Sequence, residues 1–360
     1  MRRSVPGFVT PLRYPSCMAF PLPTSLSPSK VASFKDCALA FRFSAIDRVP
    51  EPPSASAAKG TLVHRALELL YVEPPGARTL ECALTKLAEA VPEVLGGREY
   101  ESLALAGDER DRFLADAERL VRNAFLLEDP SQLRPIGLEL RMEAKIGALR
   151  LRGIIDRLEL DNDGGLIVTD YKTGKVPNVN HEQGRLGGVQ FYAFLCEQML
   201  GRRPTRVQLL YLSEPVAIVS EPTEQSLRGL RMRASAIWTA VERACDREDF
   251  RPKPSGLCNW CSFKQWCPAW GGDPKSAPSR RFELDSDHRS ASQKVATPCS
   301  GTTTTSGVTL TGGTLTIGDM LTPEESADDL IIDTAMDTAI ETAIETAIDT
   351  PASIAVPVGS

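Results

Sequence analysis

The stretch LRGIIDRLELDNDGGLIVTDYKTGK, residues 151–175, contains two apolar segments on either side of the turn-rich run DNDGG. This pattern predicts two β-strands joined as a hairpin. If the five-residue loop is symmetric, Leu158 faces Val168 and Asp156 faces Asp170, whereas a β-bulge would shift this register. The symmetric hairpin therefore predicts two carboxylates opposite each other on one face of a sheet.

Two facing carboxylates destabilise a sheet unless something compensates their charge. Lys172 lies two residues after Asp170, so the period of two along a strand places both side chains on one side and Tyr171 on the other. A divalent cation between Asp156 and Asp170 would compensate further. A metal ion lowers the pKa of a bound water, and an adjacent lysine can orient that water or stabilise charge on a phosphate. The pattern predicts metal-assisted phosphodiester hydrolysis, and the alternative is a surface salt bridge at a strand end.

The rest of the chain predicts helices on both sides of this hairpin. One helix begins well at Ser27, which can cap it, with Pro28 in its first turn. Another carries His64 and Glu68 four residues apart on one face. Helices are expected over 27–43, 60–71, 80–91, 108–127, 186–200 and 223–245, and strands over 136–146, 149–160, 166–172, 206–213 and 216–220. This order of elements predicts an α/β or α+β fold with a mixed central sheet flanked by helices.

The composition separates a foldable region from two flanking segments. The 360 residues, 42% of them hydrophobic, suffice for one large domain or two ordinary ones. Residues 1–24 are predicted to be a disordered extension, in which Met18 is a candidate for the true start. Residues 271–360 hold 5 Lys and Arg against 14 Asp and Glu, which predicts a disordered, low-complexity acidic tail. Residues 1–270 hold 36 basic and 33 acidic side chains, a balance that permits a nucleic-acid partner without requiring one.

The sequence also bears on the compartment and on the cysteines. No apolar run reaches the ~18 residues of a membrane span, and the amino-terminal segment lacks the continuous apolar core of a signal peptide. A cytoplasmic protein without a membrane partner is therefore expected. The nine cysteines are then not expected to form a disulfide framework. Three of them, Cys258, Cys261 and Cys267, lie close together and predict metal ligation.

Three segments in this order, GTLVHRALELL, LRGIIDRLEL and IVTDYKTGK, resemble the motifs of the RecB-type branch of the PD-(D/E)XK nuclease superfamily. The resemblance implies a restriction-endonuclease-like core over residues 25–270. It also implies a site for Mg²⁺ or Mn²⁺ and three catalytic side chains. The implied metal ligands are His64, Asp156, Asp170 and the backbone carbonyl of Tyr171, and the implied catalytic residues are Asp156, Asp170 and Lys172.

A second resemblance concerns the two ends of this core. CALAFRF, which begins with Cys37, and CNWCSFKQWCP, which contains Cys258, Cys261 and Cys267, are together similar to the iron–sulfur clasp of AddB and of CRISPR-associated relatives in the RecB family. The similarity implies a [4Fe–4S] cluster that joins the N- and C-terminal segments. Four cysteines also suit a structural zinc ion, which stays the alternative.

One feature departs from the family pattern. RecB-type members usually carry Gln and Tyr four residues apart on the helix after the D-x-K strand, but here Gln190 and Tyr192 are two apart. Residues two apart do not share a helical face. Gln190 and Tyr192 are candidates for contact with DNA, against the alternative of a partly buried helix.

The two resemblances together imply a metal-dependent DNA exonuclease of DNA repair or recombination. The sequence contains no GxxxxGK[ST] phosphate-binding motif, so processive unwinding would need a separate helicase. Single strands or frayed ends are the expected substrates. The alternatives are a non-catalytic DNA-binding module of the same fold and a structural four-cysteine zinc protein. The intact set of His64, Asp156, Asp170 and Lys172 favours the nuclease.

Overall fold

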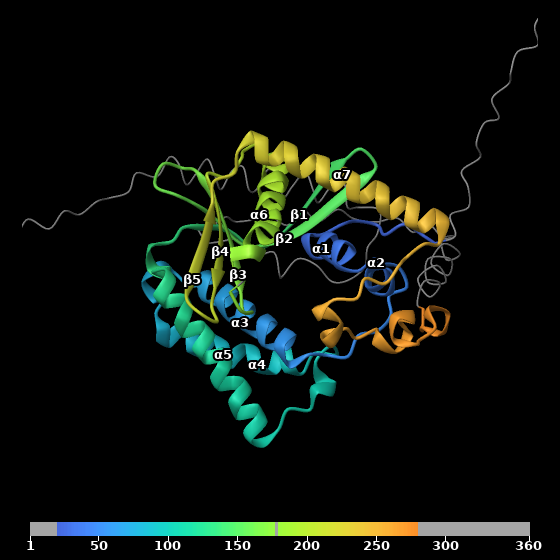
Figure 1. Ribbon diagram of the computed structural model, residues 1–360. Helices are drawn as coiled ribbons and strands as arrows, with labels where there is room; N and C mark the ends of the chain where they lie inside the picture. Colours follow the sequence, from blue (N-terminus) through green and yellow to red (C-terminus); the bar gives the residue numbers. More distant parts are fainter. Residues whose placement is uncertain (1–19, 177–178, 280–360) are drawn as a thin grey trace, which may run out of the picture. The chain divides into compact units, whose positions relative to one another are not determined.

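The computed structural model describes residues 20–176 and 179–279, and their side chains except at 179–187 (Figure 1). Met18, nearly all of the predicted N-terminal extension and the predicted tail from residue 280 onward lie outside the described residues. The described chain forms two compact units. The sheet unit contains residues 25–28, 51–176 and 179–234, and the cysteine unit contains residues 20–24, 29–50 and 235–279. The domain boundaries expected at residues 24 and 271 stay predictions.

The elements of the sheet unit follow the predicted order. Its helices are α3 (Ala55–Val72), α4 (Leu80–Leu95), α5 (Gly107–Leu127) and α6 (Val179–Met199); its strands are β1 (Pro135–Ile146), β2 (Leu149–Leu160), β3 (Leu166–Lys172), β4 (Arg206–Tyr211) and β5 (Val216–Ser220). The cysteine unit holds α2 (Ala38–Phe41) and nearly all of α1 (Pro28–Asp36), while α7 (Glu224–Arg247) begins in the sheet unit and ends in the cysteine unit. No described helix is both long and apolar enough to cross a membrane.

The helix expected over 27–43 begins at Pro28 but is interrupted at Cys37. Cys37 adopts an extended backbone, with φ −158° and ψ 110°, and forms the N-cap of α2. Its sulfur accepts a hydrogen bond of 3.5 Å from the backbone N–H of Lys253, far away in the sequence. Such a tertiary contact overrides the local helical preference that the sequence pattern reports.

The five strands form one mixed sheet in the order β1-β2-β3-β4-β5. β3 and β4 are parallel, and the other neighbouring strands are antiparallel. A parallel pair needs a crossover connection, which α6 supplies. Leu158 pairs with Val168 and Leu160 with Leu166, which confirms the predicted register of the hairpin. The chain therefore has the expected α/β fold, consistent with a restriction-endonuclease-like core.

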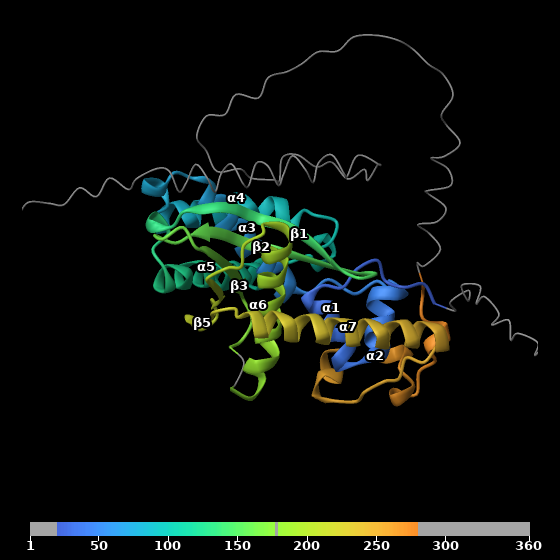
Figure 2. The ribbon, with the colours of Figure 1, turned by 90° about the horizontal axis from the view of Figure 1, so that it is seen from above.

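Helices cover both faces of this sheet (Figure 1, Figure 2). On one face, α3, α4 and α5 share a hydrophobic core with Leu138, Tyr171 and Leu210 of the strands. On the other face, α6 packs against β1, β2 and β4. A Cβ atom at Gly153 of β2 would lie only 2.9 Å from the side chain of Leu195 on α6. Glycine at this position therefore permits the close approach of helix and strand.

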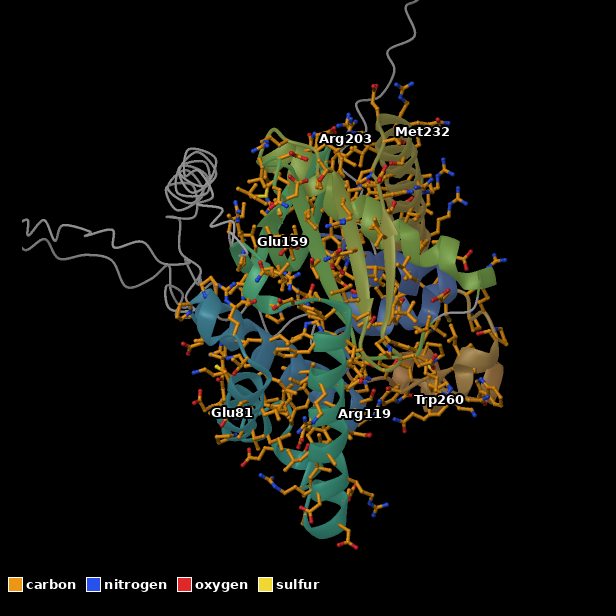
Figure 3. All side chains as sticks on the ribbon, turned by 90° about the vertical axis from the view of Figure 1, so that its left-hand side faces the viewer. Glu81, Arg119, Glu159, Arg203, Met232 and Trp260 are labelled. Carbon is orange, nitrogen blue, oxygen red and sulfur yellow. The ribbon has the colours of Figure 1, made fainter. Side chains whose placement is uncertain are left out.

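Three of the charged side chains labelled in Figure 3 differ in exposure. Glu81 on α4 and Arg119 on α5 are exposed, whereas Glu159 on β2 is buried. A buried carboxylate needs a partner. Arg157 supplies it, with Nε 3.0 Å from the Glu159 carboxylate.

Candidate metal and nuclease site

Asp156 and Asp170 lie at the same end of the β2–β3 hairpin. The last paired residues of the ladder are Arg157 and Thr169, and one further step leads to the two aspartates. The Asp156 carboxylate accepts a hydrogen bond of 2.6 Å from the backbone N–H of Tyr171. Burial raises the pKa of Asp170, and the nearby charge of Asp156 raises it further. The two predicted carboxylates therefore lie together, as the hairpin register requires.

Lys172 and Tyr192 both hold the Asp170 carboxylate. Lys172 forms an ion pair with Oδ2 of Asp170, as expected for side chains on the same side of β3. The Lys172 side chain is 33% exposed, whereas that of Asp170 is 3% exposed. From α6, the Tyr192 hydroxyl donates a hydrogen bond of 2.9 Å to Oδ1 of Asp170. The lysine is thus anchored in the structure and still reachable from solvent.

His64 reaches the same place from α3. Its Nδ1 atom lies 3.5 Å from Oδ2 of Asp156 and 4.0 Å from Oε1 of Glu139 on β1. These three side chains offer one nitrogen and two oxygen atoms within 4.8 Å of one another. Imidazole nitrogen and carboxylate oxygen together suit a divalent cation such as Mn²⁺.

Glu139 is a site residue that the strand pattern did not predict. Its position follows from the β1–β2 hairpin, in which Ile146 pairs with Leu149 across a two-residue turn. Gly147 in this turn has a φ of +60°, which glycine adopts readily. Counting back along both strands in this register places Glu139 opposite Asp156. The glycine-containing turn was therefore the signal in the sequence that could have identified it.

The backbone of Glu139 is irregular, with a φ of +46°. The irregularity changes the face to which the side chains of β1 point. Leu138 belongs to the core beneath α3, α4 and α5, but Leu140 lies beside Gly137 and Leu158. In a regular strand two residues that are two apart would share a face. Left-handed conformations of residues other than glycine are costly and cluster at functional sites.

The pKa values of His64 and Glu139 are both raised at this site. Burial alone would lower the pKa of His64, but the charge and hydrogen bond of Asp156, with Glu139, raise it to about 9. Burial and then the charge of Asp156 raise the pKa of Glu139 to about 7. Metal ligands must be deprotonated to bind. The raised pKa values of His64 and Glu139 therefore fit a site at which a divalent cation replaces protons.

The sequence profile of the PD-(D/E)XK nuclease superfamily matches residues 25–268. The chain belongs to the PD-(D/E)XK nuclease superfamily. This membership accounts for the donor set of the site, because PD-(D/E)XK nucleases are hydrolases that use divalent metals. Asp156 of β2 and the Asp170-x-Lys172 end of β3, the catalytic residues predicted from the sequence, both lie within the matched region.

The chain also resembles solved structures, at low sequence identity. A candidate exonuclease from Eubacterium rectale is 12% identical, with a TM-score of 0.43 over 66% of this chain and 87% of that chain. The protein SSO0001 is 14% identical, with a TM-score of 0.29 over 59% of this chain and 95% of that chain. No curated protein matches the sequence. Likenesses this distant carry no argument about substrate.

Four of the free thiols in the cysteine unit of this nuclease-superfamily protein are the predicted cluster ligands. They are Cys37, Cys258, Cys261 and Cys267. Burial raises the pKa of Cys261, and negative charge on the other three sulfurs raises it further, so the four lie near one another. The backbone N–H groups of Lys253 and Ser255 donate to the sulfurs of Cys37 and Cys258 at 3.5 and 3.3 Å. The predicted ligand set is therefore brought together within one unit.

Gln190 and Tyr192 have different surroundings on α6. Tyr192 points to Asp170, as described above, whereas the Gln190 side chain accepts a hydrogen bond from Arg233 of α7. Tyr192 is thus a neighbour of the site residues. Contact of either side chain with DNA stays a prediction.

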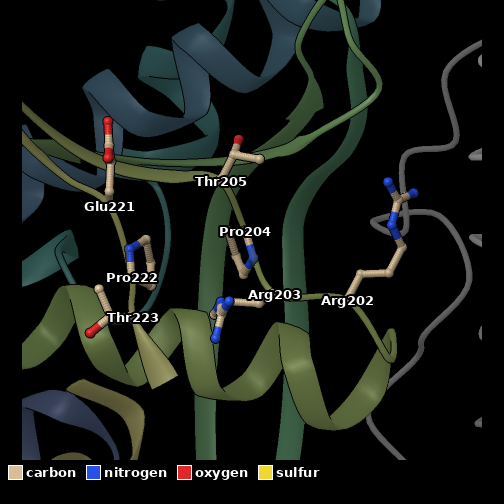
Figure 4. A pocket seen from close by; sticks show the side chains of 7 residues that line it. All are labelled: Arg202, Arg203, Pro204, Thr205, Glu221, Pro222 and Thr223. Atoms are coloured by element: carbon tan, nitrogen blue, oxygen red, sulfur yellow. The ribbon is translucent and has the colours of Figure 1, made fainter. Parts of the chain in front are cut away.

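A separate cavity of about 680 Å³ lies at the other end of β3 and β4 (Figure 4). It is lined by Arg202, Arg203, Pro204, Thr205, Glu221, Pro222 and Thr223. The Thr205 N–H donates to the carbonyl of Leu166, the first residue of β3, at 2.9 Å. The candidate site is at the last residues of β3, so this cavity does not contain it.

Proposed function

We propose that this protein is a RecB-type DNA exonuclease that requires Mg²⁺ or Mn²⁺ and acts on single-stranded or frayed DNA ends in repair or recombination. One observation carries the proposal: the metal-binding cluster of His64, Glu139 and Asp156 lies beside the Asp170–Lys172 ion pair. The order of these residues along the chain supports the RecB branch. The mildly basic balance of residues 1–270 suits DNA as the partner.

The residues of the chain divide the chemistry between them. His64, Glu139 and Asp156 would hold the cation, which polarises a phosphate oxygen and lowers the pKa of a bound water. The ammonium group of Lys172 can orient the attacking water or stabilise negative charge that develops on the phosphate. Asp170 keeps this ammonium group in place through the ion pair. Asp170 and the carbonyl of Tyr171 are proposed as further ligands.

A cleavage assay tests the proposal directly. Single-stranded and duplex DNA, labelled at the 5′ or the 3′ end, are incubated with the full-length protein and Mg²⁺, Mn²⁺ or excess chelator. Stepwise loss of nucleotides from ends, with either metal and not with chelator, is expected. Binding of DNA without cleavage under every metal condition would identify the non-catalytic DNA-binding module instead. Internal cuts in circular single strands would replace the exonuclease by an endonuclease.

We also propose that Cys37, Cys258, Cys261 and Cys267 bind a [4Fe–4S] cluster. The backbone N–H groups that donate to the sulfurs of Cys37 and Cys258 support this proposal, because N–H donors to cluster sulfurs are a known means of tuning such clusters. Four cysteines also suit a tetrahedral zinc ion, which stays the alternative. Iron, sulfide and zinc analysis of anaerobically purified protein separates the two.

A separate helicase in the cytoplasm is the proposed partner for duplex substrates. The sequence lacks the phosphate-binding motif of an ATP-driven motor. Blunt duplex DNA should therefore be degraded faster when an unrelated helicase and ATP supply single strands. An equal rate on blunt duplex with and without the helicase would remove the need for this partner.

A further inference from the structure

The face of the sheet opposite the aspartates carries a buried polar network centred on Arg157. Arg157 is 0% exposed. Its guanidinium donates to both carboxylate oxygens of Glu128, at 2.6 and 2.7 Å, and its Nε lies 3.0 Å from Glu159. Glu128 is the C-cap residue that directly follows α5. A buried arginine is tolerated only when it is paired, and loss of one partner is strongly destabilising.

Tyr171 connects this network to the metal site. Its hydroxyl donates to Glu128 at 3.1 Å and accepts a hydrogen bond from Arg157. Its backbone N–H donates to Oδ2 of Asp156, and it directly follows Asp170 in β3. Arg157 in turn directly follows Asp156 in β2. Each strand therefore carries a site carboxylate and, next to it on the other face, a residue of the network.

We propose that the Tyr171 hydroxyl and the Glu128 carboxylate are positioning groups for the metal site, a role that rests on the proposed function. The network fixes the Tyr171 side chain and with it the orientation of the Tyr171 peptide. That peptide fixes Asp156, because its N–H binds Oδ2, the same atom that lies 3.5 Å from His64. Groups that orient metal ligands typically change metal affinity by about 10–100-fold when removed.

Tyr71 provides a matched control for Tyr171. Its hydroxyl donates at 2.7 Å to Oε1 of Glu128, the same atom that accepts from Tyr171. Its ring lies 4.6 Å from the guanidinium of Arg157. Tyr71 is 1% exposed and Tyr171 is 3% exposed. The two hydroxyls thus share one network, but only the peptide of Tyr171 adjoins a site carboxylate in the chain.

The test compares Mn²⁺ binding by the full-length wild type, Tyr171→Phe, Tyr71→Phe and Glu128→Gln. Titration calorimetry gives the Kd for Mn²⁺, and thermal unfolding is recorded without metal. Tyr171→Phe and Glu128→Gln are expected to raise the Kd about tenfold or more, whereas Tyr71→Phe is expected to stay within about twofold of wild type. The two Tyr→Phe variants should lower the melting temperature to a similar extent.

Two results would overturn the inference. An unchanged Kd in Tyr171→Phe would show that the network does not position the site. An equal rise in both Tyr→Phe variants would show that it acts only through general stability. The measurement contains no DNA, so it is independent of cleavage. A protein that loses Mn²⁺ affinity in Tyr171→Phe but cuts no DNA would keep the inference and refute the proposed function.

Discussion

Glu139 and Asp156 face each other across the β1–β2 hairpin, and Glu139 holds its place there in a left-handed conformation, with a φ of +46°. Both carboxylates lie within 4.8 Å of the His64 imidazole nitrogen. Burial and the charge of Asp156 raise the pKa of Glu139 to about 7. Strained backbone and neighbouring carboxylates both destabilise the metal-free protein, and a bound cation would offset the second of these.

Glu139→Gly is therefore expected to stabilise the metal-free protein while it weakens metal binding. Glycine accepts the left-handed conformation, which costs other residues about 1–2 kcal/mol, although its flexibility in the unfolded chain returns part of this gain. We expect a net increase of about 1 kcal/mol in the free energy of unfolding, measured with urea in excess chelator. The Kd for Mn²⁺, measured by calorimetry, should rise at least about tenfold.

Glu139→Gln separates the two effects. It keeps the strained backbone and removes the charge, so metal binding should weaken as in Glu139→Gly with less gain in stability. A Glu139→Gly protein that is less stable than wild type at pH 8 would contradict the strain argument. Unchanged Mn²⁺ affinity in both variants would remove Glu139 from the metal site.

The two raised pKa values predict how stability and metal binding depend on pH. Glu139 titrates at about 7 in the folded protein instead of 4.5, and His64 at about 9 instead of 6.5. The folded metal-free protein thus binds more protons than the unfolded chain between these values, so its stability falls as the pH rises from about 4.5 to 9. Metal binding shows the opposite trend and strengthens over this range, because the cation replaces the protons.

Calorimetry in two buffers of different ionisation enthalpy tests the proton release. At pH 8, Mn²⁺ binding should release protons, mostly from His64, and His64→Gln should abolish most of this release. Mn²⁺ binding that is independent of pH between 6 and 9 would contradict the assignment of His64 as a ligand.

The sequence predicted the site residues whose positions follow from a local periodic pattern, and it did not predict those whose positions depend on irregular backbone. Asp156, Asp170 and Lys172 follow from the period of a strand and the length of one loop, and the paired residues Leu158 and Val168 confirm the register. Glu139 lies in an irregular strand position whose conformation no periodic pattern reports. The place of His64 beside Asp156 depends on how α3 packs against the sheet, which the sequence indicated only through the resemblance.

The network on the other face was not predicted for a different reason. Arg157 and Glu159 are charged residues of a strand, yet both are buried. Their burial depends on Glu128, at the end of a helix 29 residues before Arg157 in the chain. Only the folded structure shows that these three charges meet, because the pairing is tertiary and has no local period.

Lys172→Ala is expected to abolish cleavage while DNA binding largely survives. The lysine lies at the site and is paired with Asp170, and loss of a group that stabilises developing charge costs about 10²–10³ in kcat. Lys175→Ala is the matched control, because Lys175 is exposed and lies only three residues further along the chain. Single-turnover cleavage and electrophoretic shift measure the two properties separately. Near wild-type cleavage by Lys172→Ala would refute its catalytic role.

Tyr192→Phe tests whether Tyr192 serves Asp170 or the DNA. The Tyr192 hydrogen bond lowers the pKa of Asp170, although burial raises that pKa overall. Its removal should raise the pKa further, so the acidic limb of the pH–rate profile should move to higher pH. The Kd for single-stranded DNA should stay unchanged. A weaker Kd with an unshifted profile would instead support the DNA contact predicted from the sequence, and Gln190→Ala provides the comparison on the same helix.

Cys37→Ser is expected to damage folding more than it damages the chemistry of the site. Cys37 precedes Cys258 by 221 residues, and both sulfurs lie in the cysteine unit. A cross-link that closes so long a loop restricts the unfolded chain by about 5 kcal/mol, and cluster binding adds folding energy directly. Wild type purified anaerobically should be brown, with about 4 iron and about 4 sulfide ions per chain. Cys37→Ser should lose the colour and unfold at a lower temperature. Cys82 is a free thiol on α4 outside the predicted ligand set, so Cys82→Ser should keep the colour and the melting temperature of wild type.

Colourless wild type with stoichiometric zinc would show that the four cysteines bind zinc in place of the cluster. Unchanged metal content and melting temperature in Cys37→Ser would show that Cys37 binds no metal.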